Sequence, residues 1–166
     1  MALDDATQSA VRALWEVATR HGREPVPVPE ADPWEDDDPL DGRRAWVPVE
    51  IPGVPSVVVR LHRDGEDLVV VEDVVELDVP RRHTAAVVQE LLSGRARRRL
   101  RARGFLGHLL GIALHNPLPA DLVVTVDGPE PTSYEAPVVL APGTGAWLAT
   151  LATAATEPSS GDRPAG

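Results

Sequence analysis

The sequence contains no cysteine. This absence excludes a disulfide scaffold and any zinc or iron–sulfur site with cysteine ligands, and it fits a reducing compartment. Long apolar runs are also missing, because the longest covers only residues 105–114, whereas about 20 residues are needed to span a bilayer. The N-terminal residues lack the basic and apolar regions of a signal peptide. We therefore expect a soluble, cytoplasmic protein.

Recognisable catalytic, metal-binding and nucleotide-binding motifs are absent as well. The chain has no G-x-G-x-x-G, P-loop, H-E-x-x-H or G-x-S-x-G pattern. An acidic run at 35–41 does not match a calcium-binding EF-hand loop, because counting from Asp37 puts Pro39 at position 3 and Pro48 at position 12. We expect no cofactor and no metal, and the sequence favours a role other than catalysis.

Lysine is the second missing residue type, so all 16 basic residues are arginine, and the formal net charge is −10. An acidic protein repels nucleic acids and anionic membranes on average. Residues 81–104 are the exception, since they contain eight Arg and a single Glu. We therefore expect no membrane partner, and this arginine-rich stretch is the one candidate for contact with a polyanion.

The first half of the chain has the patterns of one helix and several strands. Apolar residues recur at helical spacing over 5–21. Alternation of apolar and other residues then predicts strands, and Asp64-Gly65 is a strong hairpin signal. We expect a three-stranded antiparallel meander and a separate short strand after it. The strands are at 45–51, 56–62, 67–72 and 73–79, with Pro48 placing the first at an edge.

The second half has weaker patterns. A helix is predicted over 81–93, with His83 or Thr84 near its N-cap, and another over 145–155. Residues 105–114 fit either a strand or a buried helix. Further strands are expected at 122–126 and at 134–140, the latter at an edge because of Pro137.

Between the first helix and the first strand, residues 23–44 contain five Pro and the run Glu35-Asp36-Asp37-Asp38. Proline removes backbone donors and like charges repel, so we expect a partly disordered loop, with Trp34 holding it to the body. The predicted fold is α+β: one domain over 1–156 with a disordered tail at 157–166. Its mainly antiparallel sheet has about five to seven strands, covered by N-terminal, central and C-terminal helices.

The arginine-rich segment Arg95–Arg103 is predicted to be a strand rather than a helix, because period-two alternation accounts for more of its residues. Arg97, Arg99, Arg101 and Arg103 then share one face. Three interpretations remain open. These arginines pair with carboxylates such as Glu72, Asp73 and Glu76, or contact a protein, or contact a nucleic acid. Readers of single-stranded nucleic acid usually interleave aromatic residues, and this segment has none.

We favour a non-enzymatic interaction or accessory protein, such as a chaperone-like protein, an immunity-like protein or a regulatory subunit, that binds a protein partner. This is an analogy at the level of fold. The candidate contact residues are Trp34, Asp36, Asp37, Asp38, Arg97, Arg99, Arg101 and Arg103. One alternative is a nucleic-acid or polyanion binder that uses Arg95–Arg103. Another is an enzyme whose site is assembled from scattered carboxylates and histidines, the latter including His62, His83, His108 and His115.

Overall fold

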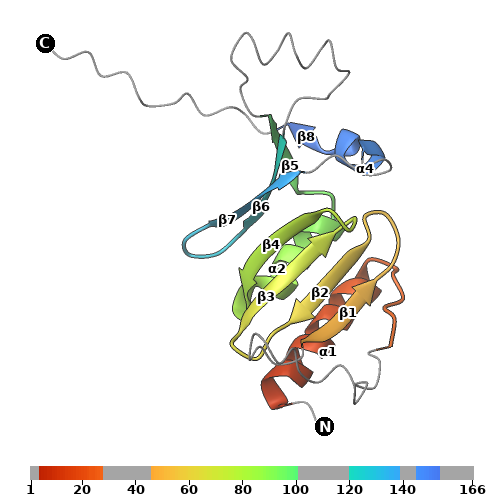
Figure 1. Ribbon diagram of the computed structural model, residues 1–166, viewed down its shortest axis with the longest axis vertical. Helices are drawn as coiled ribbons and strands as arrows, with labels where there is room; N and C mark the ends of the chain where they lie inside the picture. Colours follow the sequence, from red (N-terminus) through yellow and green to blue (C-terminus); the bar gives the residue numbers. More distant parts are fainter. Residues whose placement is uncertain (1–3, 28–45, 101–119, 139–144, 154–166) are drawn as a thin grey trace, which may run out of the picture.

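The computed structural model describes residues 4–27, 46–100, 120–138 and 145–153. Over these residues the chain is mixed α+β, with two four-stranded sheets, two long helices and one short helix (Figure 1). The predicted class is therefore confirmed. The expectation of one sheet with five to seven strands is wrong, since eight strands divide between two sheets. No helix in the described part of the chain is long and apolar enough to cross a membrane.

The first sheet is an antiparallel meander in the order β1-β2-β3-β4. Its strands are β1 (Val47–Ile51), β2 (Val57–Leu61), β3 (Glu66–Val71) and β4 (Val75–Pro80). Pro48 lies in an edge strand, as predicted from its missing N–H donor. The fourth strand is not separate from the meander, because a tight turn joins it directly to β3.

This β3–β4 turn uses two residues with positive φ that are not glycine, Glu72 (φ 52°) and Asp73 (φ 59°). Val74 N–H donates to the Val71 carbonyl at 3.2 Å and closes the turn. A side chain in this left-handed region crowds the following carbonyl, which costs about 1–2 kcal/mol per residue. The carboxylate of Glu72 offsets part of that cost by accepting the Ser56 N–H at 2.6 Å.

Replacing Asp73 with glycine should therefore raise the free energy of unfolding by up to about 1 kcal/mol, because glycine adopts positive φ without the Cβ clash. Urea unfolding followed by circular dichroism measures this change. The same substitution at Glu72 is the matched control, and it should give a smaller gain because it also removes the acceptor for Ser56. A loss of stability in Asp73→Gly would contradict the strain assigned to this turn.

The second sheet has the order β7-β6-β5-β8, with β5 and β8 parallel and the other pairs antiparallel. Its strands are β5 (Arg97–Leu100), β6 (Ala120–Val126), β7 (Thr132–Val138) and β8 (Ala152–Thr153). Pro137 lies in the edge strand β7, as predicted. The expected helix over 145–155 is shorter: α4 (Gly145–Thr150) ends where the chain turns to pair with β5 as β8.

Two longer helices cover one face of the first sheet (Figure 1). In α1 (Asp5–Arg20), the Asp4 carboxylate caps the first turn by accepting the Thr7 N–H at 2.7 Å. Hydrogen bonding from the backbone and the side chain of Thr7 lowers the pKa of Asp4. In α2 (Arg81–Leu92), the N-cap residue is Pro80, so His83 and Thr84 lie near the N-cap, as predicted. The Thr84 hydroxyl donates to the Pro80 carbonyl at 3.3 Å.

The hydrophobic core lies between the helices and the sheets. Helix α2 contacts α1, β3, β4 and β6, so it packs against both sheets. Strand β4 also contacts β7. The largest fully buried core side chains are Leu14, Ile51, Leu61, Leu77, Leu91 and Leu122. From the C-terminal segment, Trp147, Leu148 and Leu151 join the same cluster.

Candidate interaction surface

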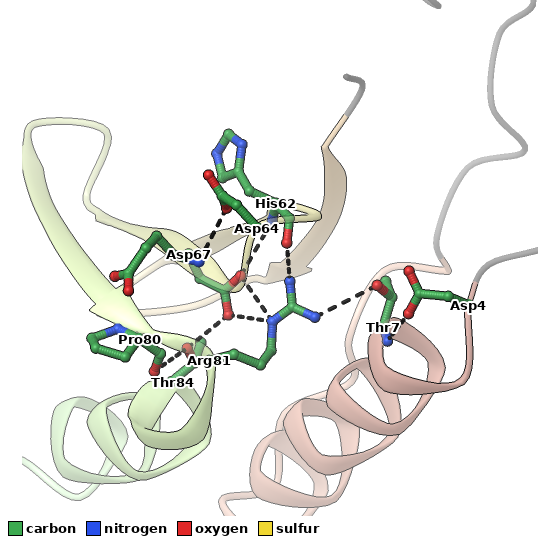
Figure 2. Close-up of polar contacts among 9 residues, drawn as sticks. Asp4, Thr7, His62, Asp64, Asp67, Pro80, Arg81 and Thr84 are labelled. Atoms are coloured by element: carbon green, nitrogen blue, oxygen red, sulfur yellow. Dashed lines mark hydrogen bonds and ion pairs between the residues drawn. The ribbon is translucent and has the colours of Figure 1, made fainter. Parts of the chain in front are cut away.

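A buried ion pair fixes the start of α2 against the first sheet (Figure 2). The carboxylate of Asp67, on the helix-facing side of β3, is fully buried. Arg81 Nε donates to its two oxygens at 2.7 and 2.9 Å. Arg81 also donates to the His62 carbonyl and, at 3.5 Å, to the hydroxyl of Thr7. One guanidinium thereby joins α2 to the β2–β3 turn and to α1.

Both oxygens of Asp67 are also bonded to other donors. Thr84 Oγ1 donates to Oδ2 at 2.8 Å, and the His62 N–H donates to Oδ1 at 3.2 Å. Each oxygen of this buried carboxylate accepts hydrogen bonds from two donors, so no lone pair is available for a substrate. The Asp67–Arg81 pair is therefore structural: it holds α2 and the β2–β3 turn in place.

The hypothesis of an enzyme requires a histidine beside a carboxylate. Within the described ranges, no histidine ring makes an ion pair or hydrogen bond with an acidic side chain, and no group of acids and histidines could hold a metal ion. His21 contacts the Gln89 amide at 2.7 Å, and His83 shares a hydrogen bond with the Tyr134 hydroxyl, whose pKa is raised by burial. His108 and His115 lie outside the described residues.

The structure confirms that the arginine-rich segment contains a strand. Arg97 is exposed on β5, and Arg99 shares its face. Arg99 forms a bidentate pair with Glu135 on β7 and lies 3.7 Å from Asp121 on β6. The hydrogen bond to Glu135 raises the pKa of Arg99. Just before the strand, Arg95 pairs with Glu90 at 2.6 Å.

The expected acidic partners of this segment were wrong. Glu72, Asp73 and Glu76 belong to the first sheet, whereas β5 pairs only with β6 and β8 among the described strands. The internal pairing of Arg99 therefore involves acids of its own sheet. Several predicted contact residues lie outside the described part of the chain: Trp34, Asp36, Asp37, Asp38, Arg101 and Arg103.

A second candidate surface is the face of the first sheet that points away from α1 and α2 (Figure 1). We call it the outer face. Its residues are Pro48, Glu50, Val58, Arg60, Leu68, Val70, Glu76 and Asp78. Strand pairing arranges them in two rows across the sheet, because residues two apart on a strand share a face.

The centre of the outer face is apolar except for Arg60, and its two sides are acidic. Val58 and Leu68, on the central strands, are half-buried, and Val70 beside them is 6 % exposed. Glu50 on β1 is exposed on one side, and Glu76 and Asp78 on β4 are exposed on the other. None of these three carboxylates pairs with a basic residue in the described parts of the chain.

Trp46 stands at one end of this face, just before β1, and it is 43 % exposed. The guanidinium of Arg60 lies 4.8 Å from the centre of the Trp46 ring. A cation near the face of an aromatic ring is attracted to it, by about 0.5–1 kcal/mol at an exposed site. Trp46 is therefore accessible while it contacts another side chain of the face, and tryptophan is enriched among the residues that anchor interfaces.

The free edge of β1 is blocked. The Val26 N–H donates to the Glu50 carbonyl at 2.9 Å, so the backbone of Glu50 points away from β2. Backbone groups two residues apart on a strand point the same way, and Pro48 at this position has no N–H to offer. A further strand therefore cannot add along this edge with full hydrogen bonding.

Arg23 holds the β1–β2 turn through two hydrogen bonds. Arg23 donates to the carbonyls of Pro52 and Val54 at 3.0 and 2.6 Å. Its guanidinium occupies the space where a Cβ on Gly53 would lie, and Gly53 has a φ of +127° that only glycine adopts readily. Val54, in the same turn, is 68 % exposed.

Trp46 and the outer face were not among the sites predicted from the sequence. Alternation at 45–51 and 56–62 already placed Trp46, Pro48 and Glu50 opposite the apolar positions of their strand. It did not show which face the helices cover. Comparisons with protein-family models, curated proteins and solved structures found no match.

Proposed function

We propose that this protein is a non-enzymatic interaction protein that binds a protein partner on the outer face of its first sheet. The observation that carries the proposal is the exposed Trp46, in contact with Arg60 and beside the apolar residues of the outer face. Tryptophan is enriched among the residues that dominate binding energy in interfaces, especially where apolar neighbours exclude water around it. An accessory role, such as that of a chaperone, an immunity protein or a regulatory subunit, fits a domain of this kind.

A protein partner is favoured over a polyanion by the charges on both sheets. Phosphate backbones are held by unpaired basic side chains. Of the described arginines near β5, Arg95 and Arg99 already pair with carboxylates, which leaves Arg97 as the exposed unpaired cation on that face. The outer face of the first sheet carries three unpaired carboxylates, which repel phosphate.

The proposal is tested by a quantitative pull-down from a native lysate with tagged wild-type protein and the variant Trp46→Ala. The wild type should retain a partner protein at stoichiometric level after a wash at moderate salt, because apolar contacts are not screened by salt. Loss of a tryptophan that anchors an interface typically costs 2 kcal/mol or more, so Trp46→Ala should bind about 30-fold more weakly.

Trp15→Ala is the matched control. Trp15 is 38 % exposed, close to the exposure of Trp46, but it lies on α1, which covers the opposite side of the sheet. The control should retain the partner as the wild type does. Equal retention by Trp46→Ala would remove the outer face from the proposal. Nucleic acid that is released by salt would instead support the polyanion alternative and Arg97.

A further inference from the structure

The shape and charge of the outer face define the kind of segment that fits it. Neighbouring strands are about 4.8 Å apart, so the acids on β1 and β4 are separated by three spacings, or about 14 Å. Between them, on β2 and β3, lie the apolar side chains Val58, Leu68 and Val70, which we call the apolar strip, and Arg60, whose guanidinium lies against Trp46. An α-helix with its side chains is about 10–12 Å wide. The space between the acids on β1 and those on β4 therefore has about the width of one helix.

The strip also has the length of a short helical contact. Trp46 and Glu50 are four residues apart on an extended segment, which spans about 13 Å. Two to three turns of helix cover that length, at 5.4 Å per turn. A helix that lies along β2 and β3 would place one side near Glu50 and the other near Glu76 and Asp78.

Other occupants fit less well. Strand addition is blocked at the free edge of β1 by Pro48 and by the hydrogen bond from Val26. A second copy of the same face would bring unpaired carboxylates against unpaired carboxylates, and like charges across an interface are strongly unfavourable. A helix with basic flanks avoids both problems, because the stems of Lys and Arg cover apolar surface while their charged ends reach the acids.

We infer that the outer face of the first sheet binds an amphipathic helix of the partner, with an apolar stripe between two rows of basic residues. This inference rests on the proposed function and specifies the partner's binding element. The apolar stripe covers Val58, Leu68 and Val70 and packs against Trp46. The basic rows pair with Glu50 on one side and with Glu76 and Asp78 on the other.

The test uses two fluorescently labelled synthetic peptides, each about four helical turns long. Both have a leucine stripe, which is flanked by lysines in one peptide and by glutamates in the other. Fluorescence anisotropy with the full-length protein should give a dissociation constant at least about tenfold lower for the lysine peptide. The variant Glu50→Lys/Asp78→Lys should lose about tenfold or more in affinity for the lysine peptide and should favour the glutamate peptide.

The control variant Glu16→Lys/Glu130→Lys has the same net charge as the test variant, but its substitutions are at exposed acids on α1 and in the β6–β7 turn. It should bind the lysine peptide as tightly as the wild type. An equal loss in the control would show that the peptide responds only to net charge, and this would overturn the inference. So would failure of the lysine peptide to bind, or equal affinity for both peptides.

The two proposals fail in different ways. If a partner is captured through Trp46 but the lysine peptide does not bind, the outer face binds proteins and the inferred helix is wrong. If the peptide binds as expected but Trp46→Ala retains the cellular partner fully, that partner uses another surface. A protein dimer in light scattering that dissociates on Trp46→Ala would assign the face to a second copy and overturn the helix.

Discussion

Replacing Asp67 with alanine should lower the free energy of unfolding by about 3–5 kcal/mol, because it removes one partner of a buried ion pair. The Arg81 guanidinium, whose side chain is only 19 % exposed, would keep its charge without a counterion. The hydroxyl of Thr84 and the N–H of His62 would also lose an acceptor. Urea unfolding followed by circular dichroism measures the change.

Two comparison variants separate the loss of the pair from the loss of a charge. Asp127→Ala removes an exposed acid in the β6–β7 turn and should change stability by less than about 0.5 kcal/mol. Asp67→Leu/Arg81→Met removes both members of the pair and should be less destabilised than Asp67→Ala, because no unpaired charge stays buried. If Asp67→Ala lowered the free energy of unfolding by less than about 1 kcal/mol, the Asp67–Arg81 pair would not be what holds α2 and the β2–β3 turn in place.

Leu91→Ala should destabilise the protein by about 2–5 kcal/mol, through lost burial and the cavity that remains. Leu91 is 0 % exposed and belongs to α2, the helix that packs against β3 and β4 of the first sheet and β6 of the second. Hydrogen exchange read by mass spectrometry should therefore show lower protection in both sheets. The expected fall is similar in peptides that cover β3 and β6.

Ala86→Gly is a useful contrast, since Ala86 is a half-buried α2 residue at the margin of the core. It should cost only about 1 kcal/mol, through helix propensity. If Leu91→Ala lowered the hydrogen-exchange protection of β6 but left the protection of β3 unchanged, the two sheets would unfold separately. In that case α2 would not couple them.

Most strands of the described structure could be predicted from local pattern. Alternation located β1, β2 and β3 to within one or two residues, because a strand with one face in the core must place apolar side chains at every second position. Missing N–H groups placed Pro48 and Pro137 on edge strands. Strand positions and edge prolines depend on residues that are close in sequence, so they can be predicted without knowledge of the tertiary structure.

The division into two sheets could not be predicted in this way. It depends on pairing between residues far apart in the chain, such as Arg97 with Ala152. The strand β8 was missed because it has only two residues, which is too short for any period to be visible.

The outer face of the first sheet could not be distinguished from its core face by sequence pattern. Val58 and Val70 face away from the helices, while Val57 and Val59 belong to the core. All four are apolar, so composition does not distinguish the two faces of this sheet. The charge pattern drew attention to Arg97 and Arg99, which lie on the second sheet, and their use as contacts remains a prediction.

The blocked edge of β1 has a consequence for the behaviour of the protein at high concentration. A sheet with an apolar outer face and an open edge is prone to aggregation, since each added strand extends the ladder and brings further apolar surface together. Pro48 removes a donor from the ladder, and Val26 already occupies the Glu50 carbonyl. This edge therefore lacks a complete row of free backbone groups, which disfavours assembly into fibrils by strand addition along β1.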